Sequence, residues 1–72
     1  MKVKIRLDTG KDVQKFVSIT STIAGDIHIT DGKGLRVSAK SLLGALYALE
    51  FDELWCESQK EIYHYIKDFI ID

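Results

Sequence analysis

Few side chains in this 72-residue chain have the types and spacing that chemistry requires. The one cysteine, Cys56, and the two histidines, His28 and His64, stand far apart and form no metal-ligand spacing. No histidine and carboxylate are placed to activate the thiol, so we expect Cys56 to be a small buried hydrophobe. The glycine-bearing segment 31–34 is too short for a phosphate-binding loop and suits a hairpin turn. The sequence therefore predicts no catalytic residue, no metal site and no cofactor.

One hydroxyl, that of Ser41, occupies a position of interest. Ser41 stands directly before an apolar run with helical spacing, where a serine side chain can cap free backbone amides. Such a cap contributes about 1 kcal/mol, and on local physics alone it is a sufficient role. Leu42, Leu43 and Leu46 follow it and could all belong to the core. Because a short helix buries one face only, we expect Leu42 and Leu46 to be partly exposed.

Composition restricts the class of protein. The chain is 46% apolar and 29% charged, the balance of one small globular domain spanning residues 1–72 and not of a disordered tail. Ten basic and eleven acidic residues give a net charge of −1, which argues against a strongly basic nucleic-acid binder. A lone cysteine predicts a reducing, cytoplasmic location. Residues 1–6 alternate charged and apolar side chains, so we expect no export signal and no membrane insertion.

Alternating apolar and polar residues predict the β-strands that would position these side chains. The strands are expected at residues 2–7, 27–30, 35–39 and 51–56, with a turn joining the second and third into a hairpin. In the fourth, which we expect to be an inner strand, Leu54 and Cys56 should lie on one face and Trp55 on the other.

Helical spacing predicts the remaining elements. Residues 40–49 form a short helix, and a last helix follows Ser58 and Glu61, which have the spacing of a capping box. The apolar stripe of that last helix consists of Ile62, Ile66, Phe69 and Ile70. Over residues 13–24, periodicity favours a helix while β-branched and hydroxyl residues favour a strand, and we predict a helix with Asp8, Thr9 or Asp12 as its cap. The resulting β-α-β-β-α-β-α order predicts an α+β open-faced β-sandwich, a four-stranded antiparallel sheet with helices covering one face.

The middle of the chain resembles a known family. The residues that carry the resemblance are Phe16-Val17, Gly25-Asp26-Ile27-His28-Ile29, Gly32-Lys33 and, most specifically, Ser38-Ala39-Lys40-Ser41-Leu42-Leu43-Gly44. They resemble the histidine-containing phosphocarrier protein (HPr) family of the bacterial sugar phosphotransferase system. The likeness covers nearly the whole chain, and the family's order of elements agrees with the order predicted above.

The sequence departs from that family at its phosphocarrier loop. The family's phosphoryl-accepting histidine would fall at about Thr9, and the arginine that steadies the phosphate at about Lys11. A threonine hydroxyl cannot replace the imidazole nitrogen that forms a labile phosphoramidate. His28 is expected in the middle of a strand and His64 in the middle of a helix, away from any helix start that could hold the product anion. We therefore predict no phosphoryl relay and treat Thr9 and Lys11 as a degenerate phosphocarrier loop.

The second functional position of the family is retained as Ser41. The resemblance implies phosphorylation of this serine by an ATP-dependent HPr kinase, as in the catabolite-repression HPr-like branch that lacks the acceptor histidine. It also implies protein partners, namely the kinase, a catabolite-control repressor or phosphotransferase-system proteins. Their docking patch would be formed by Leu42, Leu43, Leu46 and Tyr47. The chain would then be a regulatory protein-binding module and not an enzyme.

Three alternatives stay open at this stage. The chain could be a genuine phosphocarrier in sugar transport that uses another acceptor. It could be a nucleic-acid-binding sheet with Trp55 as the stacking ring and basic groups around it. Those groups would be Lys2, Lys4, Arg6, His28 and Arg36. The third alternative is a structural or oligomerising domain without a switch.

Overall fold

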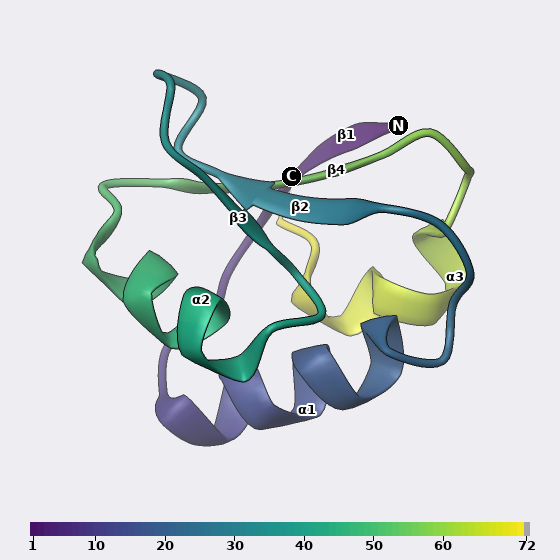
Figure 1. Cartoon of the computed structure of the whole chain (residues 1–72), viewed down its shortest axis with the longest axis horizontal. Coiled ribbons are helices and arrows are strands. Elements are labelled where there is room, and N and C mark those ends of the chain that lie inside the picture. The colour runs from purple at the N-terminus through teal and green to yellow at the C-terminus, as the bar shows by residue number, and fades with distance from the viewer. Residues whose placement is uncertain (72) are drawn as a thin grey trace.

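The computed structural model describes residues 1–71 and has an α+β architecture (Figure 1). Its strands are β1 (Lys2–Ile5), β2 (Ile27–Thr30), β3 (Arg36–Ser38) and β4 (Leu54–Ser58). Its helices are α1 (Gly10–Thr20), α2 (Leu42–Tyr47) and α3 (Tyr63–Ile66), with 3₁₀ turns at Ala48–Glu50 and Lys67–Phe69. The elements follow the predicted order. In segment 13–24, where periodicity and propensity disagree, residues 13–20 belong to helix α1.

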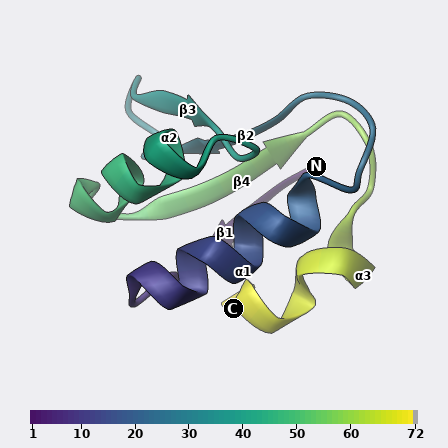
Figure 2. The same cartoon turned by 60° about the horizontal axis from the view of Figure 1, so that its bottom comes forward.

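The four strands form one antiparallel sheet in the order β1-β4-β2-β3, so β4 is an inner strand as expected. The helices lie along one side of this sheet and leave the other side open (Figures 1 and 2). The arrangement agrees with the predicted open-faced sandwich.

Strand alternation decides which side chains enter the core. Leu54 and Cys56 of β4 are buried on the helix side, whereas Trp55 lies half-buried on the open side, as predicted. Ile29 of β2 and Phe16 of α1 have no exposed surface, and Phe16 packs edge-on against Phe69 with ring centroids 5.3 Å apart. This packing fixes α1 under the sheet and overrides the local strand propensity of its sequence.

The two edges of the sheet differ. On the β1 side the chain's own C-terminal segment pairs with the edge: Ile5 bridges Ile70, and the Arg6 amide donates to the Phe69 carbonyl at 2.8 Å. The Ile71 amide then donates to the Lys4 carbonyl at 3.0 Å. On the other side, β3 is the last strand of the sheet.

The predicted capping box of the last helix is wrong. Ser58 belongs to β4, where its amide donates to the Met1 carbonyl at 2.9 Å and its residue pairs with Ile27 of β2. Partners on both sides extend the strand past its predicted end at residue 56. The Glu61 carboxylate instead accepts the Tyr63 amide at 2.7 Å, and α3 begins at Tyr63.

Candidate functional site

Ser41 caps helix α2, as predicted. Its Oγ accepts a hydrogen bond from the Gly44 amide at 3.2 Å, and its side chain is exposed. The helix is anchored from beneath by Ala45 and by Ala48 of the following turn, which have no exposed surface. The missing side chain of Gly44 lets β3 approach closely, because a Cβ there would lie 3.4 Å from the Cβ of Val37.

A buried hydrogen bond holds the segment that leads into this helix. The Thr20 hydroxyl, at the end of α1, donates to the Ala39 carbonyl at 2.7 Å, and neither residue has exposed surface. The Ala39 amide donates in turn to the Ile27 carbonyl at 2.8 Å. Helix α1 and strand β2 thus fix the backbone two residues before Ser41. No local pattern in the sequence indicates this link.

An apolar surface follows the cap along α2. It consists of Leu42, Leu43, Leu46 and Tyr47, and we call it the α2 apolar surface. Leu42 and Leu46 are 42% and 37% exposed, which confirms their predicted partial exposure, while Leu43 is 81% exposed. Four large apolar side chains on one short helix form an exposed patch of the kind that marks protein contact. Leu49, which is 36% exposed, lies in the turn after α2; it was predicted in the helix but not in the docking patch.

The start of α1 borders this surface. A Cβ on Gly10 would lie 3.8 Å from Cδ2 of Leu46, so the backbone between Thr9 and Lys11 lies beside the α2 apolar surface. Lys11 is exposed, and Thr9 is the N-cap of α1.

The start of α1 is closed by its own side chains. Thr9 Oγ1 accepts the Asp12 amide at 3.2 Å, while the Asp12 carboxylate accepts the amides of Asp8 and Thr9 at 2.9 and 3.2 Å. This reciprocal capping box uses amides that could otherwise hold a phosphate, and it places a carboxylate in the first turn. The geometry disfavours a second anion at this position.

The two histidines lie on different elements. His28 is half-buried in β2 on the open side of the sheet, with Nδ1 3.4 Å from a guanidinium nitrogen of Arg36. His64 is exposed, and its ring meets that of Tyr63 edge-on with centroids 6.0 Å apart. It was expected in the middle of a helix. Helix α3 has only four residues, and His64 is the second of them. The structure brings neither histidine to Ser41 or to Thr9.

Cys56 is buried as expected. Burial raises the pKa of its thiol from 9.0 to about 12, so it stays protonated near neutral pH and is a poor nucleophile. Within residues 1–71, no three histidine, cysteine or acidic side chains are grouped to hold a metal ion.

The open side of the sheet carries both signs of charge. The ammonium groups of Lys2 and Lys4 lie 5.6 and 5.9 Å from the centre of the Trp55 ring, as the nucleic-acid alternative required. Acidic residues are interleaved with these cations, however. Glu57 approaches Arg36 to 3.3 Å and Glu53 approaches Lys4 to 3.8 Å. Arg6, also assigned to this group, pairs with Asp8 at 2.8 Å instead. Such a balanced face offers a nucleic-acid backbone little net attraction.

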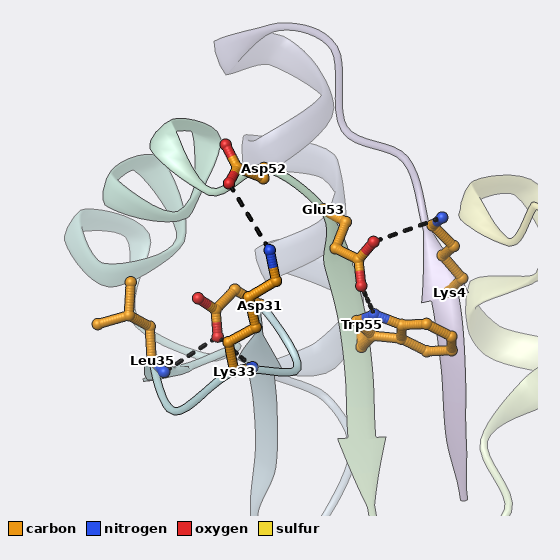
Figure 3. A network of polar contacts seen from close by, with 7 residues as sticks. All are labelled: Lys4, Asp31, Lys33, Leu35, Asp52, Glu53 and Trp55. Atoms are coloured by element: carbon orange, nitrogen blue, oxygen red, sulfur yellow. Dashed lines mark hydrogen bonds and ion pairs between the residues drawn. The ribbon is translucent and has the colours of Figure 1, made fainter.

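Polar contacts that the sequence did not predict surround the β2–β3 hairpin turn and the Trp55 ring (Figure 3). The Asp31 carboxylate accepts the amides of Lys33 and Leu35 at 2.7 and 3.0 Å, and the bond from Lys33 lowers the pKa of Asp31. The Trp55 indole donates to Glu53 at 2.8 Å, which lowers the pKa of that carboxyl. These bonds stabilise the hairpin turn and orient the Trp55 ring, so we assign them a structural role.

Comparison of the chain with protein-family models, curated proteins and solved structures finds no match. The resemblance to the HPr family therefore rests on the motifs in the sequence. Across the described residues, no helix has the length and apolar character needed to cross a membrane.

Proposed function

We propose that this chain is an HPr-like regulatory module of the cytoplasm that binds protein partners through the α2 apolar surface. Phosphorylation of Ser41 would change which partner binds. The observation that carries the proposal is the exposure of the α2 apolar surface, above all of Leu43 at 81%, directly after an accessible serine. By resemblance, the partners are an HPr kinase, a catabolite-control repressor or phosphotransferase-system proteins.

The two helix starts beside this surface support a switch at Ser41 and not at Thr9. Helix α1 begins with a self-satisfied capping box that includes the Asp12 carboxylate. Helix α2 has no acidic residue in its first turn, and its cap is the Ser41 hydroxyl alone. A phosphoryl group on Ser41 would add about −1.5 to −2 charges at the rim of the apolar surface without meeting a like charge in that turn. Such a change alters partner choice while the core stays packed.

The test is intact-protein mass spectrometry after incubation with a purified HPr kinase and ATP. We expect one phosphoryl addition to the wild-type chain, none to Ser41→Ala, and an unchanged addition to Ser18→Ala, an exposed serine on α1. A parallel reaction with phosphoenolpyruvate and the first enzyme of the phosphotransferase system should add nothing. An acid-labile phosphohistidine in that reaction would overturn the proposal and make the chain a carrier.

The docking role is tested with the same kinase as the partner. Leu43→Asp should lower kcat/KM for phosphorylation of Ser41 by about tenfold or more, since burying a leucine side chain is worth about 1.5–3 kcal/mol. Tyr65→Asp is the matched control, because Tyr65 is an exposed apolar residue on α3, outside the α2 apolar surface. Equal rates for the two variants and the wild type would exclude docking through α2.

A further inference from the structure

We infer that the partner binds as an extended segment that adds a fifth strand to the free edge of β3, with side chains reaching the α2 apolar surface. The inference rests on the proposed function and specifies the form of the partner.

The first observation is the direction in which the backbone N–H and C=O groups of β3 point. The Ala39 amide donates to the Ile27 carbonyl at 2.8 Å, and the Asp31 amide donates to the Leu35 carbonyl at 3.3 Å. Bonded pairs alternate along an antiparallel ladder, so the backbone groups of Arg36 and Ser38 point away from β2.

The outer edge of β3 is therefore largely unpaired. The Ser38 carbonyl accepts the Ser41 amide at 3.3 Å. Among residues 1–71, no backbone hydrogen bond outside the ladder engages the Arg36 amide, the Arg36 carbonyl or the Ser38 amide. These three groups have the two-residue spacing that an added strand requires.

The opposite edge offers a comparison within the same molecule. There, residues 69–71 run beside β1 and pair with Lys4, Ile5 and Arg6. The fold thus covers one edge of its sheet with an extended backbone segment and leaves the other edge free.

Side chains beside β3 indicate the chemistry of the added strand. On the helix side, Leu35 is 48% exposed, and Val37 lies beside Gly44, which follows Leu43 in α2. On the open side, the Arg36 guanidinium pairs with Glu57 at 3.3 Å, but its side chain is 58% exposed and keeps donors for a second carboxylate. A strand with apolar residues on one face and an acidic residue opposite Arg36 complements both.

The experiment selects peptides from a random displayed library against the folded chain, and then titrates a selected peptide into isotope-labelled protein. We expect amide hydrogen exchange at Arg36 and Ser38 to slow by about tenfold or more, because each gains a main-chain bond. This measurement uses the wild-type chain and needs no variant. We also expect the selected peptides to alternate apolar and acidic residues.

Proline at position 36 gives an independent test. Arg36→Pro removes an amide that the ladder to β2 does not use, and it should weaken peptide binding about tenfold. Arg36→Lys keeps both the amide and the charge and should bind as the wild type does. Amide spectra of both variants, recorded without peptide, report whether the sheet is intact.

Other outcomes would overturn strand addition. Peptides that lose binding in Leu43→Asp but leave both β3 amides unprotected would place the partner on α2 alone and leave the proposed function standing. Concentration-dependent protection of the same amides without peptide would make a second copy of the chain the occupant. Strand addition is also overturned if no selected peptide depends on the β3 edge for binding. The kinase assay then still decides the proposed function separately.

Discussion

Replacing Thr20 by valine tests whether one buried hydroxyl holds the segment leading to Ser41. Valine keeps the shape of threonine but removes the donor that bonds the Ala39 carbonyl at 2.7 Å. Both residues have no exposed surface, so water cannot replace the lost partner. A buried carbonyl left without a donor costs about 1–3 kcal/mol.

This cost is large for so small a domain. At about 0.05–0.15 kcal/mol per residue, a chain of 72 residues has a total stability of about 4–11 kcal/mol. With a urea m value of about 1 kcal/mol/M, Thr20→Val should lower the unfolding midpoint by about 1 M or more. Urea titration followed by the fluorescence of Trp55 measures the shift.

Thr22 provides a matched control. Its hydroxyl also donates to a backbone carbonyl at 2.7 Å, that of Ile19, but the residue is exposed and water can replace the bond. Thr22→Val should change the free energy of unfolding by less than about 0.5 kcal/mol. If Thr20→Val and Thr22→Val unfold at the same urea concentration, the argument from burial is wrong. Amide shifts at Ser41 in folded Thr20→Val would report whether the segment has moved.

Three further perturbations have outcomes set by the structure. The unfolded chain loses the Cys56 proton above about pH 9 and the folded chain keeps it to about pH 12, so stability should fall as the pH rises through this window, by at most about 4 kcal/mol; urea titrations at pH 8 and pH 11 should show a smaller fall for Cys56→Ala. Gly32→Ala should cost about 1 kcal/mol or more, because φ is +78° and the new Cβ would lie 3.3 Å from the Trp55 indole nitrogen, whereas Gly10→Ala, at a helical position with room, should cost nothing measurable by thermal unfolding. Ser41→Ala should cost about 1 kcal/mol through loss of the α2 cap, and Ser41→Asp, which can still cap, should unfold within about 0.5 kcal/mol of the wild type.

The faces of the strands could be predicted from the sequence because the two-residue period of a strand is local. That period placed Leu54 and Cys56 in the core and Trp55 on the open side. The ends of the strands depend on neighbours distant in sequence. Ser58 extends β4 because the Met1 carbonyl and the β2 ladder lie beside it, and no local pattern carries that information.

Helix caps can likewise be predicted from the sequence only where no distant neighbour competes for the capping residue. The cap at Ser41 was predicted, and Thr9 was one of three candidates for the cap of α1, because each side chain can bond an amide three residues later. Ser58 and Glu61 have the spacing of a capping box but form none, because Ser58 is the last residue of β4 and pairs within the sheet. The link from Thr20 to Ala39 spans 19 residues and could not be predicted from spacing.

Fold and chemistry are set by different residues in this chain. The arrangement of strands and helices follows from buried apolar residues such as Phe16, Ile29 and Ile66. These core residues do not determine which function the surface carries. The chemistry depends on single side chains at helix starts. At α1, Thr9 and Asp12 cap each other and place a carboxylate in the first turn, which disfavours an anion there. At α2, Ser41 satisfies one amide and remains exposed. The fold is therefore compatible with the proposed loss of a carrier role, and phosphorylation at Ser41, rather than the fold, distinguishes the proposed switch from a silent domain.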